Sequence, residues 1–174
     1  MANDPYLNLP EVPSFTLTSP DVVDGAALPS WARGGDAGGE DRSPALAWSG
    51  APAETRGYAL TVYDPDAPTG SGFWHWAVFG IPGDTSALPA GAGDPDAGLL
   101  PAGTVTLPNE MRTERYIGAA PPAGHGVHRY FFTLSALDTA ELSVPPGATP
   151  AVLGFLMRES IVARAHLVAT SVTP

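Results

Sequence analysis

Apolar and polar residues alternate in short runs along this chain, and clusters of glycine and proline separate the runs. In the run 14–19, Phe15 and Leu17 alternate with two threonines. A period of two places successive side chains on opposite faces of a β-strand, so each run is typical of a strand with one buried face. The pattern predicts an antiparallel all-β domain.

Further strands are predicted from the same alternation, and long surface loops are predicted at 25–43 and 82–101, where glycine and proline gather. The run 127–137 is the longest and is apolar on both faces at its centre, which is typical of a central strand. The other predicted strands are 45–49, 58–64, 73–81, 104–107, 115–118 and 164–172.

A single α-helix is predicted from 150 to 163. Thr149 is a suitable N-cap, and Pro150 suits the first helical position because its missing N–H would have no partner there. The helical spacing predicts one packed face, made of Val152, Leu153, Leu156, Ser160, Val162 and Ala163. No repeat or boundary divides the chain, so residues 1–174 are expected to form one domain with its core at 14–170.

Composition tests whether this pattern belongs to an ordered protein. The 174 residues include 20 glycines and 20 prolines, close to the share of roughly 25 to 30% that is typical of disorder. However, 44% of the residues are hydrophobic, and they include four tryptophans, five tyrosines and six phenylalanines. Such residues bury enough apolar area to offset chain entropy, which favours a loop-rich globular domain.

Charge excludes several classes of partner. The net charge is -10, and the cations are eight scattered arginines. Phosphate backbones and anionic membrane surfaces repel such a chain, so no nucleic acid partner is expected. The first ten residues lack a signal pattern, and no apolar stretch approaches the roughly 18 residues of a membrane span. We therefore expect a cytoplasmic protein without stable membrane insertion, and the absence of cysteine excludes disulfide and thiol chemistry.

One motif that carries chemistry is the segment 64–68, which reads Asp-Pro-Asp-Ala-Pro. It ends one predicted strand, and Trp74 and His75 begin the next after a short turn. In such a hairpin Asp64 or Asp66 can reach His75, which gives a carboxylate and imidazole pair at one sheet edge. The alternative is that these residues only form the turn, since Asp bonds nearby backbone and Pro fixes φ.

A second motif covers 119–130 and contains two histidines. A period of two places His128 and Tyr130 on one face of the strand and Arg129 on the other. Pro121 and Pro122 provide a stiff apolar wall, and the glycines around His125 let the backbone approach a ligand. The alternative is a structural His128 and a merely exposed His125. His166 is expected to be structural.

These motifs, in this order and spacing, resemble the phosphatidylethanolamine-binding protein family, and more closely its bacterial branch described as Raf kinase inhibitor-like. The resemblance covers 14–170. It implies an antiparallel Greek-key β-sandwich with a few peripheral helices, and a small pocket at one end that accepts phosphate-like anions.

The resemblance also implies which residues bind the ligand. Asp66 and Pro68 are expected at the rim, Trp74 as an apolar neighbour, and His125 as a contact from the loop. Arg129 is expected to face away and to pair with an acidic residue. The remaining pocket residues are Asp64, His75, Ala120, Pro121, His128 and Tyr130.

Electrostatics pose one question about this pocket. Protonated His75 and His128 would donate to a phosphate, whereas a nearby Asp64 carboxylate should repel a fully ionised one. Either a proton is shared with the ligand or the carboxylate, or Asp64 raises the pKa of His75 so that it can donate. We expect the second, with phosphate affinity falling as pH rises through the imidazole range.

The sequence favours a non-catalytic protein that binds a small anion such as phosphate, acetate or a phosphoethanolamine-like headgroup. Two alternatives stay open: an interaction protein that modulates a kinase or protease, and an acid/base enzyme. No cofactor is expected, and the histidine spacing does not favour a metal site. A homodimer is expected, with Trp31, Trp48 or the Phe155 region at its interface.

Overall fold

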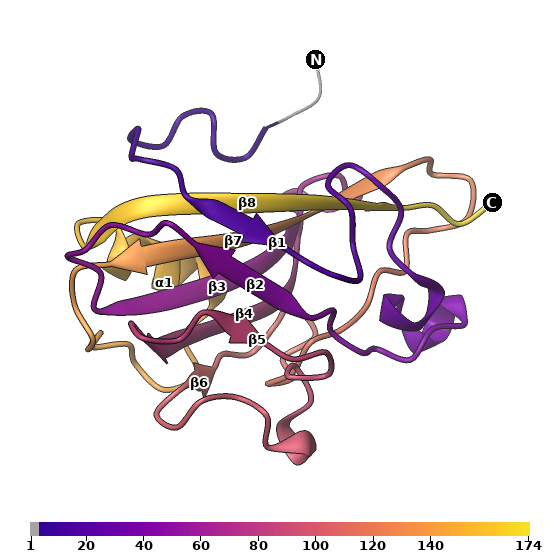
Figure 1. Cartoon of the computed structure of the whole chain (residues 1–174). Coiled ribbons are helices and arrows are strands. Elements are labelled where there is room, and N and C mark those ends of the chain that lie inside the picture. Colours follow the sequence, from indigo (N-terminus) through magenta and orange to yellow (C-terminus); the bar gives the residue numbers. More distant parts are fainter. Residues whose placement is uncertain (1–3) are drawn as a thin grey trace.

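Two antiparallel sheets pack face to face in the computed structural model, which describes residues 4–174 (Figure 1). The larger sheet has five strands in the order β6-β4-β3-β7-β8. Its strands are β3 (Gly57–Asp64), β4 (Phe73–Pro82), β6 (Val105–Thr106), β7 (His128–Leu137) and β8 (Ile161–Ser171). The predicted fold class is confirmed: the protein is mostly β, and β3 lies at the centre of the larger sheet beside the long β7.

The smaller sheet has the order β1-β2-β5 and lies against one face of the larger sheet. It consists of β1 (Thr16–Thr18), β2 (Leu46–Ser49) and β5 (Ala87–Leu88). The predicted loop at 25–43 carries two short 3-10 turns, η1 (Ser30–Ala32) and η2 (Gly35–Ala37), and a third, η3, covers Pro95–Ala97.

The core fills the space between the two sheets. Tyr58, Leu60 and Val62 alternate along β3 and point into it, as the period of two predicts. Trp76 from β4 and Phe132 from β7 join them, both almost completely buried. Because Asp64 continues the same alternation, it lies on this inner face at the end of β3.

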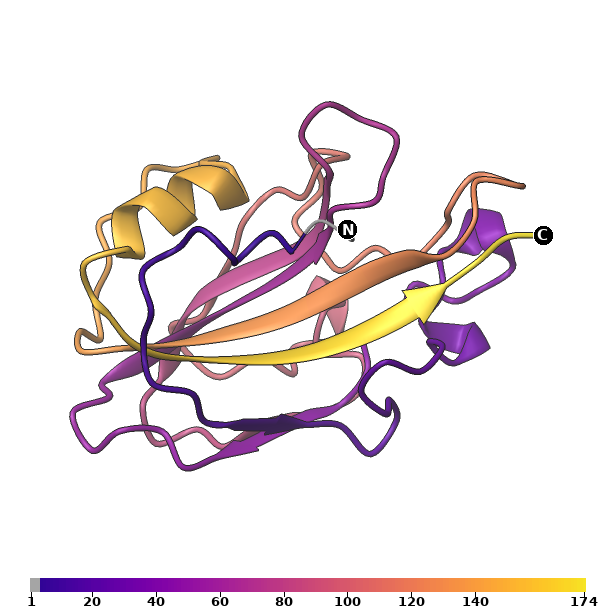
Figure 2. The same cartoon turned by 90° about the horizontal axis from the view of Figure 1, so that it is seen from above.

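The opposite face of the larger sheet is covered by the helix α1 (Pro150–Met157) and by the N-terminal segment (Figure 2). Thr149 caps the helix as predicted, because its side chain accepts a hydrogen bond from the Val152 N–H. Pro150, Leu153 and Met157 are the buried residues of α1, and the last two pack with Ala59 and Ala77 of the sheet.

Several sequence predictions were wrong. The helix ends at Met157, and 161–163 begin β8, because Ile161 and Ala163 pair with Leu137 and Ala136 of β7. The ladder overrides the helical pattern there. Consequently the predicted helical face is also wrong: Val152 and Leu156 are exposed.

The predicted strand at 115–118 is not formed. Its backbone N–H groups bond to three separate partners: Tyr116 to Gly93, Ile117 to His75, and Gly118 to the Asp41 carboxylate. No single neighbouring strand is available to make a ladder.

Two surface features also differ from expectation. Trp48 is 5% exposed and lies in the core, so it is not available for an interface. β5 forms inside a predicted loop because Leu88 pairs with Leu46.

In the part of the chain that the structure describes, no helix is long and apolar enough to cross a membrane.

Candidate functional site

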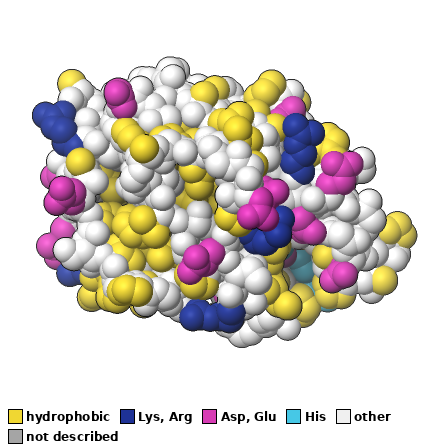
Figure 3. Space-filling view, turned by 90° about the horizontal axis from the view of Figure 1, so that it is seen from below, with side chains coloured by type: hydrophobic (Ala, Val, Ile, Leu, Met, Phe, Trp, Pro, Cys, Tyr) yellow, Lys and Arg dark blue, Asp and Glu magenta, His cyan; other side chains and the backbone are white. Residues whose placement is uncertain are grey.

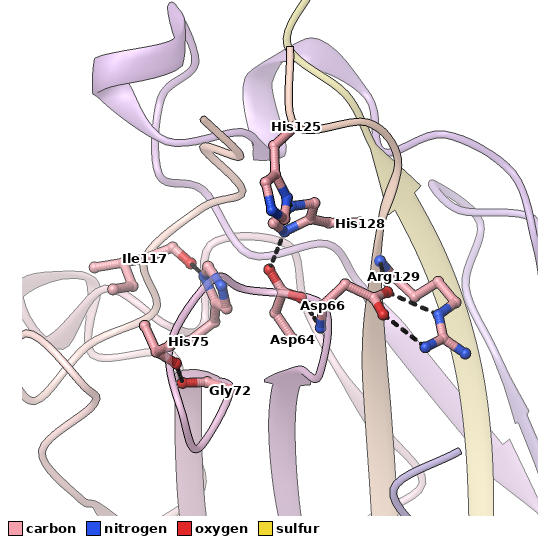
Figure 4. Close-up of polar contacts among 9 residues, drawn as sticks. Asp64, Asp66, Gly72, His75, Ile117, His125, His128 and Arg129 are labelled. Carbon is pink, nitrogen blue, oxygen red and sulfur yellow. Dashed lines mark hydrogen bonds and ion pairs between the residues drawn. The ribbon is translucent and has the colours of Figure 1, made fainter. Parts of the chain in front are cut away.

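The candidate site lies at one end of the larger sheet, where the last residues of β3 lie beside the first residues of β4 and β7. β3 runs antiparallel to both β4 and β7, so its last residue lies beside the first residues of its two neighbours. Asp64 pairs with Phe73, and Tyr63 pairs with Phe131. The register therefore brings together the side chains of Asp64, His75 and His128, although 64 positions separate the first and last of them (Figure 4).

The turn between β3 and β4 fixes the position of Asp64. Asp64 Oδ1 accepts a hydrogen bond of 2.8 Å from the Asp66 N–H, which closes an Asx-type turn. Gly72 has φ +69°, and a Cβ at this position would overlap the Tyr63 hydroxyl and the Asp64 carbonyl oxygen. A tight turn with glycine at this point is what permits the carboxylate to sit at the strand end.

A chain of hydrogen bonds links three of the side chains. The His128 Nδ1 lies 2.7 Å from Asp64 Oδ2, and its Nε2 lies 2.7 Å from His125 Nδ1. The side chains of Asp64 and His128 are both almost completely buried. With Asp64 ionised, Nδ1 of His128 carries the proton and donates to it, so the carboxylate fixes the orientation of the ring.

His75 bonds elsewhere. Its Nδ1–H donates to the Ile117 carbonyl oxygen at 2.9 Å, and the structure gives no hydrogen bond between His75 and Asp64. Burial lowers the pKa of His75, and the Ile117 carbonyl and the Asp64 charge oppose this shift without cancelling it. Asp64 does raise the pKa of His75, but burial outweighs this effect, so the prediction of a protonated His75 that donates to the ligand is wrong: the ring is neutral at pH 7, and Nε2 is a hydrogen-bond acceptor.

Tyr130 is packed against this histidine. The two rings meet edge to face with centroids 5.0 Å apart. Burial raises the pKa of the Tyr130 phenol well above its usual value, and the Asp64 charge adds to the effect. Its hydroxyl therefore keeps its proton at any physiological pH and is a permanent donor.

These groups line a cavity of about 670 Å³, a volume within the usual range of ligand sites. Of the residues predicted to bind a ligand, the structure places seven on its wall: Asp64, Pro68, His75, Ala120, Pro121, His128 and Tyr130. A histidine is visible in a recess of the surface, with charged side chains nearby (Figure 3).

The other three predicted residues do not line this cavity. Trp74 faces the opposite side of the sheet, beside Tyr63. His125 reaches the site only through its contact with His128. Asp66 accepts hydrogen bonds from the Arg129 backbone N–H, Nε and Nη2 at 3.0, 2.7 and 2.7 Å.

The pairing of Arg129 with an acidic residue is as expected from the sequence, and the acid is Asp66. The Arg129 guanidinium lowers the pKa of the Asp66 carboxyl, chiefly through these side-chain hydrogen bonds. Asp66 thus fastens the turn to β7 rather than facing the cavity.

Sequence reasoning missed the contribution of the loop at 34–41. Asp41 fastens this loop to the site, because its two carboxylate oxygens accept from the N–H groups of Gly35 and Gly118. Asp36 and Glu40 then lie exposed on the cavity wall. Nothing in the local pattern of this segment indicates its distant partner, so no sequence signal was available.

The same holds for Arg115 and Met111, which line the cavity from the segment before Ile117. Arg115 lies 3.8 Å from Asp94, an exposed pair with little energetic weight. Among residues 4–174, no three His, Asp or Glu side chains are grouped so that they could hold a metal ion.

The comparisons with known proteins identify the family of this chain. The family model described as phosphatidylethanolamine-binding protein matches residues 18–172. YbhB of Escherichia coli is 43% identical over 157 residues, which cover 88% of this chain and 97% of YbhB. The chain belongs to the phosphatidylethanolamine-binding protein family, in its bacterial YbhB and YbcL branch.

Solved structures show the same relationship. The crystal structure of Escherichia coli YbcL, described as a new member of the mammalian PEBP family, covers 92% of this chain with a TM-score of 0.88 and 37% identity. This chain covers 99% of the YbcL chain. The carboxypeptidase Y inhibitor, solved with its cognate proteinase, matches with a TM-score of 0.55 at 22% identity, which shows a shared fold alone.

One relative bears on location. A protein of Mycobacterium tuberculosis that is 37% identical over 92% of this chain carries the name lipoprotein LppC. Membership of the family therefore does not fix a compartment, and the cytoplasmic location stays a prediction.

Proposed function

We propose that this protein binds a small anionic ligand, a phosphate or a phosphorylated headgroup, in the cavity lined by His75, His128 and Tyr130. The observation that carries the proposal is the mixture of buried donors and acceptors on one wall. The Tyr130 hydroxyl is a donor, whereas the neutral His75 Nε2 and the Asp64 carboxylate are acceptors. A phosphate monoanion presents both acceptor oxygens and at least one O–H, so it matches this wall.

This arrangement favours the first of the two electrostatic alternatives. A buried carboxylate repels a dianion, while a phosphate monoanion can donate a proton to a neutral acceptor. The proton is then on the ligand rather than on His75, and it reduces the repulsion between the ligand and the Asp64 carboxylate.

The mouth of the cavity adds a preference for a zwitterion. Asp36 and Glu40 are exposed carboxylates on its wall. An ammonium group a few bonds from the phosphate would lie near them, as in phosphoethanolamine, the headgroup to which the family's name refers. Trp74 is not part of this proposal, and Pro68, Ala120 and Pro121 supply the apolar wall.

The experiment is a thermal melt with increasing inorganic phosphate, phosphoethanolamine or acetate. A ligand that binds only the folded state raises Tm with concentration. We expect Tm to rise for the unchanged protein and for His166→Gln, a control on the opposite face of the same sheet. His75→Gln and Tyr130→Phe should lose most of the effect. Equal stabilisation in the cavity variants would contradict the proposal.

A second function rests on the hydrogen bonds from Asp64 through His128 to His125. A carboxylate that orients an imidazole is an arrangement used in general acid and base catalysis. A screen of phosphate esters for turnover, repeated with His128→Gln, tests an acid/base enzyme. Turnover that survives His128→Gln would exclude this mechanism.

Two further expectations about partners can be tested directly. If the protein modulates a kinase or protease through its surface, a pull-down should still capture that partner after the cavity histidines are substituted.

A homodimer through the helix is supported by Phe155, which is 63% exposed, and native mass spectrometry measures the assembly. Substitution Phe155→Ser should shift a dimer to monomer, and a monomer at all concentrations would exclude it.

A further inference from the structure

A second cavity lies on the opposite face of the larger sheet and is lined by residues of α1 and of the N-terminal segment. Figure 2 shows these two segments over that face. Its volume is about 670 Å³, and none of its lining residues belongs to the histidine cavity. Its floor consists of outward-facing side chains of β3 and β7, namely Thr61, Tyr63, Thr133 and Ser135.

Most of the lining is hydrocarbon or aromatic ring. Tyr63 and Trp74 stack at 4.2 Å between centroids on the sheet side. Phe155 lines it from α1, and Leu9 lines it from the N-terminal segment. Space is left open beneath the helix, because a Cβ added at Gly154 would meet no atom within 4 Å. Such a surface suits an apolar ligand of moderate size.

One charged group in the wall lacks a counterion. Arg164 of β8 lies beside Ser135 of β7 and is partly buried. Within residues 4–174 its guanidinium makes no ion pair and no hydrogen bond, and the Tyr6 ring lies 5.9 Å from it. Burial lowers the pKa of Arg164, as expected for a cation that has lost water without gaining an acid.

The other arginine of this cavity, Arg158, already has an acidic partner. Arg158 Nη2 donates to Glu159 at 2.8 Å, and Nη1 donates to the Phe155 carbonyl oxygen at 2.7 Å. Of the two arginines that line this cavity, Arg164 is the one without an ion pair or a side-chain hydrogen bond to any of residues 4–174.

We propose that this cavity binds an apolar carboxylate, with its carboxylate group on the Arg164 guanidinium and its hydrocarbon beneath α1. A planar guanidinium pairs with a carboxylate through two parallel hydrogen bonds. The aromatic rings and the space at Gly154 receive the hydrocarbon. The ligand is either a medium-chain fatty acid or an aromatic acid, and both share this chemistry.

Isothermal titration calorimetry with decanoate, 3-phenylpropionate and decanol tests the proposal. We expect saturable binding of at least one of the two acids below about 1 mM and at least about tenfold weaker binding of decanol. Arg164→Gln should weaken acid binding by about tenfold or more, while the matched variant Arg158→Gln should change it by less than about twofold.

Gly154→Leu is the second variant, and it places a side chain in the cavity itself. Leucine is the better helix former, so the fold is expected to persist, as a circular dichroism melt would show. Both acids should lose binding in Gly154→Leu. The proposal is overturned if neither acid binds, if decanol binds as tightly as decanoate, or if Arg164→Gln or Gly154→Leu binds the acids like the unchanged protein.

Discussion

The Nδ1 atom of His128 lies 2.7 Å from Oδ2 of Asp64, and the two side chains are 2% and 3% exposed. Each group satisfies the other in a place where an unpaired charge would be costly. The pair therefore persists as one unit, and any anion that enters the cavity meets a carboxylate that is already present. Under the function proposed above, this relationship decides which protonation state of a phosphate can bind.

The affinity for phosphate monoesters should fall as pH rises from about 5 to 8, since their second pKa is near 6. Only the monoanion donates an O–H to the neutral His75 Nε2, and burial, which lowers the pKa of His75, extends the pH range in which the ring is neutral. Isothermal titration calorimetry with phosphoethanolamine at several pH values measures the slope.

Sulfate is the control for this pH dependence, because it has the same shape and carries no proton in the same range. We expect weak sulfate binding that does not follow the phosphate curve. If sulfate affinity rose at low pH in parallel with that of phosphate, protonation of the protein would be the cause, and the neutral His75 would be refuted.

Removing the carboxylates at the cavity mouth should separate zwitterions from simple anions. In the double variant Asp36→Asn and Glu40→Gln, phosphoethanolamine should bind about two- to fivefold more weakly, which is the weight of exposed charge pairs. Inorganic phosphate should bind slightly more tightly, because two repelling charges are gone. A parallel loss for both ligands would contradict the assignment of the ammonium to these residues.

The Asp66 and Arg129 pair should stabilise the fold without contributing to binding. Asp66→Asn should lower the free energy of unfolding by about 1 kcal/mol at pH 7, the upper value for a partly exposed pair. The Arg129 guanidinium lowers the folded pKa of Asp66 below 3.8, so this stability is present above that value and is lost as pH falls through the folded pKa.

Urea denaturation of Asp66→Asn and of the unchanged protein at pH 7 and near pH 3 measures this difference. The gap should shrink at the lower pH, and phosphate binding at pH 7 should be unaffected. A gap that widened in acid would contradict the direction of the Asp66 shift.

The turn after β3 offers a matched pair of glycine variants. Gly72→Ala should lower the free energy of unfolding by about 2 kcal/mol or more, because φ is +69° and the new Cβ overlaps Tyr63 and Asp64. At Gly70 a Cβ meets nothing within 4 Å, so Gly70→Ala should be nearly neutral. Thermal melts compare the two, and equal Tm values would show that the turn does not hold Asp64.

Most strands of this fold were predictable from alternation alone. β3 carries a period of two, and its residues Tyr58, Leu60 and Val62 face the core as the pattern predicts. β7 is buried on both faces, as its apolar centre predicts. Thr149 as a cap followed from local chemistry, since an N-cap contact spans only three residues. The end of α1 was not predictable, because the pairing of Ile161 with Leu137 outweighs local helical preference.

The candidate site was likewise predictable from the sequence only in part. The proximity of Asp64 to the start of β4 followed from a short hairpin, and the shared face of His128 and Tyr130 followed from the period of two. Which imidazole bonds to Asp64 did not follow. The choice depends on β7 being the other neighbour of β3, and on the Ile117 carbonyl, which takes the His75 proton.

The sequence by itself determined the strands, the turn chemistry and the polar residues that stand at strand ends, because these depend on neighbours a few positions away. The tertiary structure decided the register between β3 and β7 and the place of the loop at 34–41 on the cavity wall. It also placed Arg164 in the cavity beneath α1 without an acidic partner among residues 4–174. The physical reason is that burial and hydrogen-bond partners are set by segments far apart in the chain. The burial that lowers the pKa of His75 and removes water from Arg164 therefore arises only when those segments have packed.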